Sequence, residues 1–433
     1  MVARQRDKVQ GATEKLLGRK HPDKQKGIRY YWDRMNRHLL HTPEGVRDLY
    51  GIEYRKKRKV EELLHQSLVL YGYEDIQTPT FEYFDVFSRE IGTTPSRELY
   101  KFFDKEGNTL VLRPDFTPSI ARCAAKYFQE EHRPLRFSYL GSAFTNTSNL
   151  QGKLKECTQL GAELVGDSSV EADGEMISLV VHALLGIGCK RFQVSIGDVE
   201  FFKGLCEEAG LDEETELELR ACISGKNYFA AQELLKERQV EEPYLGRLLK
   251  VADLFGNVCA AAGHGMTDDG QEKAVCPLAA AREMAHNTRS LSAIRRLEKL
   301  YEILKLYQVE DYVSFDLGLL SKYKYYTGMV FKAYTYGVGE AVAKGGRYDH
   351  LLAQFGKEAP AVGFVMVIDS ILEALSRQQV EIPVPGPSTE LVYTPEKYSE
   401  CLQEVMRMRR QGIPVCFNPG ERAGGKPCMK TDI

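Results

Sequence analysis

The sequence predicts an α/β fold of the α+β kind, in which a mostly antiparallel sheet is flanked by helices and interrupted by a helical insertion. Three observations lead to this prediction. Short β-type runs alternate with tight turns, as in "ELYKFFDKEGNTLVLRPD". From residue 204 to residue 308, charged amphipathic helices such as "LSAIRRLEKLYEILKLY" replace them. The β pattern then resumes at "YVSFDLGLL".

The length and composition are those of a soluble globular protein. A chain of 433 residues is long enough for about three domains, and its 43% hydrophobic and 27% charged residues are ordinary for such proteins. No run approaches the roughly 18 apolar residues of a membrane span, and the N-terminus lacks the apolar core of a signal peptide. Ten cysteines form no C-x-x-C pair, so free buried thiols are favoured over disulfides or zinc. We therefore expect a cytoplasmic protein without a membrane or metal site.

Positive charge is concentrated at the N-terminus. Residues 1–40 hold 11 basic and 4 acidic residues, a surplus of seven, which leaves −10 for the rest of a chain whose total is −3. This segment is predicted to be a disordered extension. A body that acidic disfavours general nucleic-acid binding, because phosphate neutralisation needs clustered cations. The basic run Arg55–Lys59 leads into Val60, Leu63, Leu64 and Leu68, which are spaced as the buried stripe of a helix. The run itself is interpreted as a solvated helix start rather than an RNA contact.

The elements of the first half follow from local signals, in chain order. A helix is expected near 54–70, then a strand that Pro79 breaks or confines to an edge. After the hairpin, "TPSIARCAAKYF" predicts a helix capped by Thr117 with Pro118 at its first position. The segments "PLRFSYLGSAF", "CTQLGAELVG" and "KRFQVSIGD" predict strands, and "EADGEMISLVVHALLGIG" predicts an apolar helix.

After the insertion, "APAVGFVMVIDSILEAL" predicts a strand that leads into a helix, and "EIPVPGPSTE" predicts a linker. The last segment offers one β-α-β pattern and a polar tail, which is too small to bury a core alone. The predicted organisation is a basic extension (1–40), the first part of the body (41–203), the helical insertion (204–308), the second part of the body (309–380), and a linker with a small truncated β-α-β segment (381–433).

Two pairs of polar residues are candidates for binding a small polar molecule. Asp115 and Thr117 follow a strand, where a carboxylate and a hydroxyl can receive an ammonium group; either residue could equally be a helix N-cap. Gln159 and Glu163 lie four apart on one side of a strand, which is also the pattern of a solvated strand face.

Aromatic and glycine residues could complete such a site. The stretch "SKYKYYTGMVF" places Tyr325 and Tyr326 at a strand edge, with Lys322 and Lys324 beside them. The glycines of "KGGRYDHLL" allow close approach of a ligand, although a tight turn is the commoner reason for such a pair. None of these motifs is specific alone.

The order of the motifs is specific. Along the chain the motifs follow one another in the order RPDFT, QLGAE, YYTG, GGRYD and AVGF. This order resembles that of histidyl-tRNA synthetase, a class II aminoacyl-tRNA synthetase, and the resemblance extends from about residue 42 to residue 375. This resemblance implies the class II fold. It also implies that the amino-acid pocket consists of Asp115, Thr117, Gln159, Glu163 and Tyr326, with Tyr325 alongside.

The chain departs from the synthetase where ATP chemistry needs cations. Ser321 stands at the place of the catalytic arginine, Thr145 and Thr147 stand in the F-R-x-E stretch that grips ATP, and Asp369 and Ser370 replace a Glu-Arg pair. Guanidinium groups stabilise the charge that builds up on phosphate, and each lost donor of this kind typically costs about a hundredfold to a thousandfold in rate. These departures predict a site that binds and does not react.

A retained amino-acid pocket without the ATP-binding arginines resembles the regulatory subunits of ATP phosphoribosyltransferase, a family of non-catalytic synthetase paralogues. "LLHTPEGVRDLYG" and "RPDFTPSIARCAA" match this family well. The resemblance implies a homodimer that assembles with a short catalytic chain, as a hetero-octamer, for the first step of histidine biosynthesis. It implies no cofactor and no tRNA, and a pocket that could bind free histidine.

Two other functions are compatible with parts of the sequence. A divergent class II synthetase or amino-acid ligase would use lysines in place of the arginines and would exchange pyrophosphate with ATP. A tRNA-sensing module would need a basic groove, which the net charge of the body does not favour.

Overall fold

The computed structural model describes residues 40–88, 94–147, 154–257, 276–321, 325–386, 388–420 and 426–427. The chain divides into two compact units, Met1–Glu381 and Ile382–Ile433. The basic extension predicted for residues 1–40 lies, apart from Leu40, outside the described residues. Within them, no helix is both long and apolar enough to cross a membrane.

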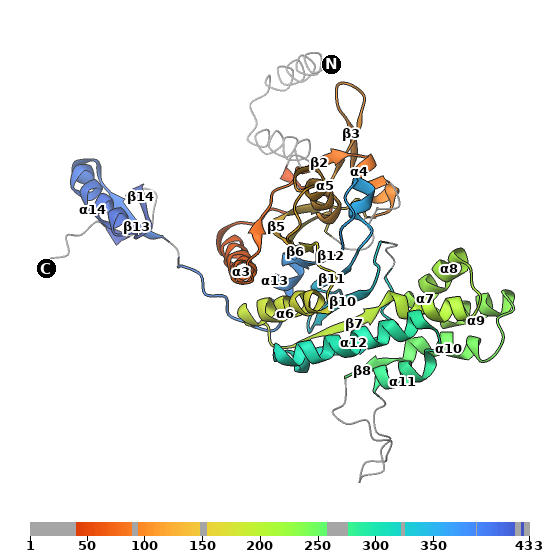
Figure 1. The fold of residues 1–433 in the computed structure, drawn as a ribbon. Helices are drawn as coiled ribbons and strands as arrows, with labels where there is room; N and C mark the ends of the chain where they lie inside the picture. Colours follow the sequence, from red (N-terminus) through yellow and green to blue (C-terminus); the bar gives the residue numbers. More distant parts are fainter. Residues whose placement is uncertain are drawn as a thin grey trace, which may run out of the picture. The chain divides into compact units, whose positions relative to one another are not determined.

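A mixed sheet forms the centre of the first unit (Figure 1). Over the described residues it has nine strands in the order β1-β5-β6-β12-β11-β10-β7-β9-β8. Their bounds are β1 Glu74–Asp75, β5 Leu135–Phe144, β6 Glu156–Val165, β7 Phe192–Asp198, β8 Phe255–Gly256, β9 Val313–Asp316, β10 Met329–Thr335, β11 Ala343–Arg347 and β12 Ala361–Val367. Only the β1–β5 and β7–β9 pairs are parallel, so the predicted mostly antiparallel sheet is confirmed.

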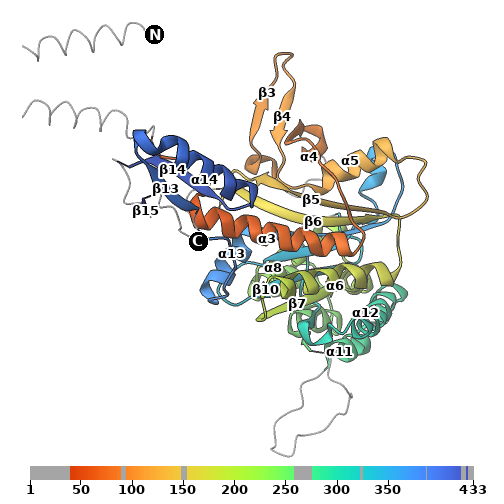
Figure 2. The same cartoon turned by 90° about the vertical axis from the view of Figure 1, so that its left-hand side faces the viewer.

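Three helices cover one face of this sheet: α3 Gly51–Leu70, α6 Val170–Gly186 and α13 Ile368–Arg377. Figure 2 shows α3 and α6 running alongside the strands. Helix α6 is buried along most of its length, as its continuous apolar sequence predicts, and the side chain of Ser169 caps its N-terminus. The even-numbered residues of β6 point to this face, and Leu160, Ala162 and Leu164 among them are fully buried.

Helix α3 corrects the interpretation of the basic run. Of the predicted stripe, Val60, Leu64 and Leu68 are buried, whereas Leu63 is only half-buried. However, Lys57 is only 9% exposed, and its ammonium bonds to Asp369 of α13 at 3.2 Å and to Thr158 of β6 at 2.7 Å. The prediction of a solvated run is therefore wrong for Lys57, because its charge is balanced by a carboxylate more than 300 residues away in sequence.

A second, three-stranded sheet in the order β2-β4-β3 stands beside the large one (Figure 2). It consists, among the described residues, of β2 Phe81–Tyr83, β3 Lys101–Phe103 and β4 Thr109–Leu112, and the short helix α4 Asp85–Ser88 follows β2. The predicted hairpin is therefore present. The strand expected before it is broken around Pro79, with β1 in one sheet and β2 in the other, because proline cannot donate to a strand ladder.

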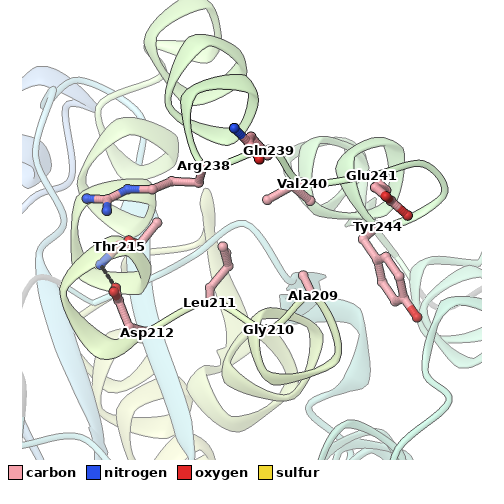
Figure 3. Close-up of a pocket in the computed structure, with 10 residues that line it drawn as sticks. All are labelled: Ala209, Gly210, Leu211, Asp212, Thr215, Arg238, Gln239, Val240, Glu241 and Tyr244. Atoms are coloured by element: carbon pink, nitrogen blue, oxygen red, sulfur yellow. Dashed lines mark hydrogen bonds between the residues drawn. The ribbon is translucent and has the colours of Figure 1, made fainter.

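The segment predicted as a helical insertion is helical in the structure, and it also contributes the edge strand β8. Helix α7 Val199–Glu208 begins before residue 204 and so crosses the predicted start of the insertion. The other described helices of the segment are α8 Glu213–Ser224, α9 Tyr228–Glu237, α10 Tyr244–Lys250, α11 Pro277–Met284 and α12 Thr288–Leu306. Side chains between α7 and α10 line an open surface pocket of about 310 Å³ (Figure 3). The pocket is lined by a few apolar residues and by the charged residues Arg238, Glu241 and Asp212. The side chain of Asp212 caps the N-terminus of α8.

The second unit contains β13 Thr389–Tyr393, α14 Tyr398–Arg410, β14 Val415–Pro419 and β15 Lys426–Pro427. Both β14 and β15 pair in parallel with β13. The sequence predicted one β-α-β pattern and a polar tail, but a short stretch of that tail adds a third strand. A two-residue strand is too short to leave a periodic signal in the sequence.

Candidate functional site

The site lies on the face of the large sheet that α3, α6 and α13 leave open. Gln159, Gly161 and Glu163 alternate along β6 and therefore share this face. The register places Glu163 opposite Gly363 of β12, and Gly363 opposite Gly346 of β11. Helix α5 Thr117–Tyr127 packs over the same face through a cluster that includes Phe116 and Ile120 of α5's N-terminal region and Phe137 and Tyr139 of β5.

Glu163 is the centre of the site. It is 1% exposed, and its two carboxylate oxygens accept hydrogen bonds from Thr117 Oγ1 at 2.7 Å and from the Tyr348 hydroxyl. Burial raises the pKa of Glu163 to about 8, although the hydrogen bonds from Tyr348 and Thr117 act in the opposite direction. A buried carboxylate with two fixed donors is a strong acceptor site for a ligand cation or N–H group.

Asp115 adds a second carboxyl group at the start of α5. Burial raises the pKa of Asp115 to about 7, while Lys344 and the backbone N–H of Thr117 lower it. Its Oδ1 atom is buried without a hydrogen-bond partner among the described residues. The proximity of Asp115 also raises the pKa of Glu163, so the two carboxyl groups share one electrostatic environment.

Thr117 is not the N-cap of α5, and Asp115 accepts a hydrogen bond from the N–H of its first residue without being the N-cap residue. Thr117 is the first residue of α5, and the N-cap residue is Phe116, which makes no side-chain capping bond. The predicted capping by Thr117 is wrong, because its hydroxyl donates to Glu163 instead. The solvated-face alternative for Gln159 and Glu163 is also wrong, since the two residues are 7% and 1% exposed.

Two glycines leave space on the surface of the sheet for side chains of the site. A Cβ atom at Gly363 would stand 1.6 Å from Glu163 Oε2, and one at Gly346 would stand 2.7 Å from the Tyr326 ring. Gly346 lies within β11, so the tight-turn interpretation of the glycine pair is wrong. The glycines instead clear space for the Glu163 carboxylate and the Tyr326 ring on neighbouring strands.

Aromatic rings form the wall of the site. Tyr325 and Tyr326 lie with ring centroids 4.4 Å apart, and Tyr325 meets Tyr348 edge-on at 5.9 Å. The Tyr139 hydroxyl lies over Gly161, where an added Cβ would meet it at 2.3 Å. Gln159 lies further along β6; its Oε1 atom is buried and has no partner among the described residues. The structure thus brings Asp115, Thr117, Glu163 and Tyr326 together, with Tyr325 and Gln159 at the margins.

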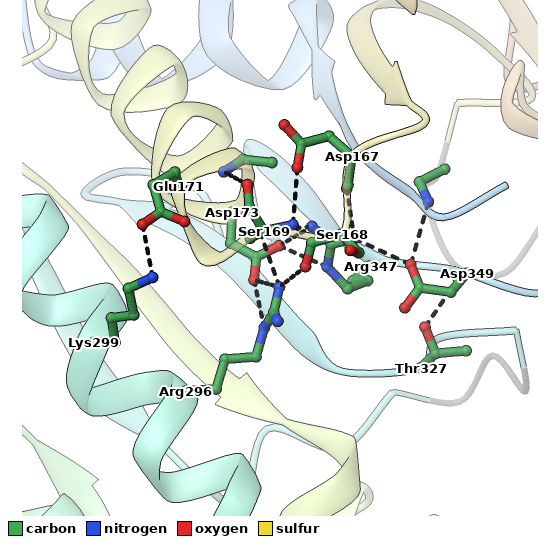
Figure 4. A network of polar contacts seen from close by, with 12 residues as sticks. Asp167, Ser168, Ser169, Glu171, Asp173, Arg296, Lys299, Thr327, Arg347 and Asp349 are labelled. Atoms are coloured by element: carbon green, nitrogen blue, oxygen red, sulfur yellow. Dashed lines mark hydrogen bonds and ion pairs between the residues drawn. The ribbon is translucent and has the colours of Figure 1, made fainter. Parts of the chain in front are cut away.

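A buried network of ion pairs and hydrogen bonds links the GGRYD stretch to Thr327 of the YYTG stretch (Figure 4). Arg347 of the GGRYD stretch is 2% exposed and pairs with Asp173 of α6 at 2.6 Å. Arg296 of α12 binds the other oxygen of the same carboxylate at 2.6 Å. Asp349 accepts a hydrogen bond from Arg347, and its backbone N–H donates to Thr327 of the YYTG stretch. GGRYD and YYTG are therefore tied together structurally rather than through a ligand.

The positions that depart from the synthetase have other contacts. The N–H of Thr145 donates to the Lys155 carbonyl at 2.9 Å, and Thr147 Oγ1 is buried without a partner among the described residues. The Ser321 carbonyl accepts a 3.5 Å hydrogen bond from Arg220 of the insertion. Ser370 lies in the first turn of α13. Lys322 and Lys324, which the sequence placed beside the two tyrosines, lie outside the described residues.

Three residues of the site were not identified from the sequence: Tyr348, Tyr139 and Lys344. Tyr348 belongs to the GGRYD stretch, so its motif was recognised but not its hydrogen bond to Glu163. Tyr139 and Lys344 carry no local signal, because their roles depend on which strands are neighbours. Among the described residues, no cluster of His, Cys, Asp and Glu could hold a metal ion.

Comparisons with known proteins agree on one family. The family model described as "Histidyl-tRNA synthetase" matches residues 45–371. Proteins named "ATP phosphoribosyltransferase regulatory subunit" from Acetivibrio thermocellus and Ruminiclostridium cellulolyticum are 38% and 35% identical. The alignment with the first covers 87% of this chain and 86% of the relative, and the second covers 88% and 87%.

Solved structures give the same result. The structure of an "ATP phosphoribosyltransferase regulatory subunit/histidyl-tRNA synthetase" from Bacillus halodurans C superimposes with a TM-score of 0.77 at 31% identity, over 89% of this chain and 94% of the other. A histidyl-tRNA synthetase from Nostoc sp. PCC 7120 shares the fold, with a TM-score of 0.69 at 18% identity over 89% and 87% of the two chains. The chain belongs to the family of ATP phosphoribosyltransferase regulatory subunits, built on the fold of histidyl-tRNA synthetase.

Proposed function

We propose that this chain regulates a short-form catalytic ATP phosphoribosyltransferase in the first step of histidine biosynthesis, and that it binds an amino acid without reacting with it. The observation that carries this proposal is the contrast within one site. The carboxylate of Glu163 is held by Thr117 and Tyr348, whereas Thr145, Thr147, Ser321 and Ser370 supply no cation.

The amino acid proposed for the pocket is free histidine, the end product of the pathway. Asp115 and Glu163 can accept the N–H groups of an α-ammonium or an imidazole, and the hydroxyls of Thr117 and Tyr326 can complete the hydrogen bonds. Because these groups are buried, a ligand that lacks matching donors leaves them unpaired at a cost of roughly 1–3 kcal/mol per group. This cost favours a small polar ligand over an apolar one.

Binding of histidine would regulate the complex through linkage. A ligand that prefers one state of the assembly shifts the equilibrium towards that state by its difference in affinity, typically about 1–3 kcal/mol, and the coupling is reciprocal. The proposed assembly is a homodimer of this chain bound to catalytic chains, as a hetero-octamer, in the cytoplasm. Histidine would bias it towards a less active form.

The test of the assembly uses the two purified chains. Mixing this chain with a short-form catalytic chain should shift both to a larger species in size-exclusion chromatography and should raise the transferase rate. Separate elution at micromolar concentrations, with no change in rate, contradicts the regulatory role.

The test of the ligand uses Glu163→Ala in the same assembly. This variant removes the acceptor of two buried hydrogen bonds, so the histidine concentration that inhibits the transferase should rise by about tenfold or more. Calorimetric titration of the isolated chain with histidine should show a similar loss of affinity. Unchanged inhibition would place the histidine site outside this pocket.

A further inference from the structure

An amino acid brings a negative charge as well as a positive one into the candidate pocket. The four ligand contacts proposed above, Asp115, Glu163, Thr117 and Tyr326, offer carboxyl and hydroxyl groups only. The α-carboxylate of a bound amino acid would therefore meet two acidic groups in a buried setting. A buried anion is costly unless a cation or several donors face it, so the pocket needs a positive group on the same face of the sheet.

The strand register places Lys344 on that face. Lys344 of β11 stands opposite Val365 of β12, and Val365 stands opposite Gly161 of β6. Directly opposed residues in antiparallel strands project their side chains to the same side. Gly161 lies between Gln159 and Glu163 along β6. Lys344, Val365 and Gly161 therefore form a cross-strand row that passes between these two residues on the face of the sheet that carries the pocket.

The neighbours of Lys344 are pocket residues. Gly346, two positions further along β11, supports the Tyr326 ring on the same face. The charge of Lys344 lowers the pKa of the Asp115 carboxyl and also that of the Cys157 thiol, which lies two residues before Gln159. The ammonium group is therefore within electrostatic range of both the acidic end of the pocket and the Gln159 end.

We propose that Lys344 binds the α-carboxylate of the amino acid whose α-ammonium is held by Asp115. In the absence of ligand, the Lys344 and Asp115 charges attract one another across the pocket. An amino-acid zwitterion can lie between them, with its ammonium against Asp115 and its carboxylate against Lys344, so that each buried charge keeps an opposite partner. The inference deepens the proposed function, because it assumes that the pocket holds an amino acid.

Lys332 provides a matched control. It stands directly opposite Lys344 on β10, in the same row and on the same face, but one strand further from β6 and β12. Its charge acts on Asp316 of β9 rather than on Asp115. Both lysines are partly exposed, so each can be replaced without leaving a fully buried cavity. Replacing Lys332 therefore measures how the loss of a nearby positive charge changes ligand affinity when the proposed contact of Lys344 is retained.

The experiment is a calorimetric titration of the full chain with two ligands. Histidine carries the carboxylate, and histidinol has a hydroxymethyl group in its place. Lys344→Met should weaken histidine binding by about tenfold to a hundredfold, the range for a hydrogen bond to a charged group. It should change histidinol binding by less than about threefold, since no carboxylate is present. Lys332→Met should leave the affinity for both ligands unchanged, and Lys344→Arg should retain most of the histidine affinity.

The outcomes separate the two proposals. If the wild-type chain binds histidine, and Lys344→Met leaves that affinity within twofold or weakens histidinol equally, the assignment of Lys344 is wrong while the proposed function stands. If the wild-type chain binds no histidine, the ligand proposed for the pocket and the role of Lys344 both fail. A thermal unfolding scan of each variant, with Lys344→Gln as a second replacement, checks that the loss of affinity is not a loss of folding.

Discussion

Two regions of the same domain compare differently with a histidyl-tRNA synthetase: the amino-acid pocket around Glu163 resembles it, and the positions that would bind ATP do not. Glu163 is buried and paired with the hydroxyls of Thr117 and Tyr348, and glycines on two strands leave room for the site residues. At the positions where a synthetase would grip ATP, Thr145, Thr147 and Ser370 are short hydroxyl residues. The buried cation Lys57 pairs with Asp369, the residue before Ser370 on α13, on the face of the sheet opposite to Glu163.

Under the proposed function, this difference separates amino-acid binding from ATP chemistry. A polar group that is buried in the fold needs its hydrogen-bond partners, because a buried group without partners destabilises the fold. The Glu163 region is therefore constrained both by stability and by any ligand that it binds. Arginines that act only on ATP make little contribution to folding, so their loss leaves the sheet intact. The predictions below test whether the two regions are as independent as this view requires.

The largest effect expected is on adenylate formation. Three departures from guanidinium to hydroxyl, each typically worth about a hundredfold or more, should reduce histidine-dependent ATP–pyrophosphate exchange by at least about ten-thousandfold relative to an active synthetase. An active histidyl-tRNA synthetase assayed in parallel is the control. Exchange near about one turnover per second, the ordinary range for enzymes, would remove the distinction between the two regions.

The next effect concerns the buried pair on the opposite face. Lys57→Met leaves Asp369 buried without its cation and should lower the free energy of unfolding by about 3 kcal/mol. Lys59→Met on the same helix removes only a partly exposed pair with Glu62 and should cost less than about 0.5 kcal/mol. Urea unfolding measures both. Histidine affinity should not change in either variant; a change with Lys57→Met would show that the two faces are coupled.

A smaller loss of stability, with a specific loss of binding, is expected for Gly363→Ala. The added Cβ would displace the Glu163 carboxylate, so histidine affinity should fall by at least about tenfold, and the strain should cost about 1–3 kcal/mol of stability. Gly339→Ala adds a methyl group with no atom within 4 Å and is the matched control. Wild-type affinity in Gly363→Ala would mean that the ligand does not contact Glu163.

The smallest effect is a pH dependence of stability. Burial raises the pKa of Glu163 from its ordinary 4.5 to about 8, so the folded chain holds this proton more tightly than the unfolded chain. Stability from this group is fully present below about pH 4.5 and is lost as the pH rises through 8; Asp115, with a pKa of about 7, acts in the same direction. Glu163→Gln cannot titrate.

The measurement compares wild type and Glu163→Gln by thermal unfolding between pH 5 and pH 8.5, because the difference removes the contribution of other groups. The midpoint of the wild type should fall relative to that of the variant as the pH rises. Parallel curves would show that Glu163 is ionised throughout, held by the donors Thr117 and Tyr348 despite its burial.

The sequence was sufficient for the sheet, the order of the motifs and most of the residues that the structure brings together at the candidate site. Hairpin signals, alternation and the apolar helix each left a local pattern, and the motif order identified Glu163 and Tyr326 without showing what they contact. Residues whose role depends on strand register were missed or misjudged. Lys57 lies within a run of five cations and carries no mark of its partner Asp369, and Lys344 faces the pocket only because β11 pairs with β12.

Asp173 has a consequence for how the chain can fold. Its carboxylate is fully buried and is shared by Arg347 of the central sheet and Arg296 of the helical insertion. Burial raises the pKa of Asp173, and the two guanidinium groups oppose that shift. If the insertion were excised, Arg296 would be lost with it and one oxygen of a buried carboxylate would have to find another donor. The inserted segment is thus part of the folding unit, and a shortened chain that joins residue 203 to residue 309 should not reach the native state.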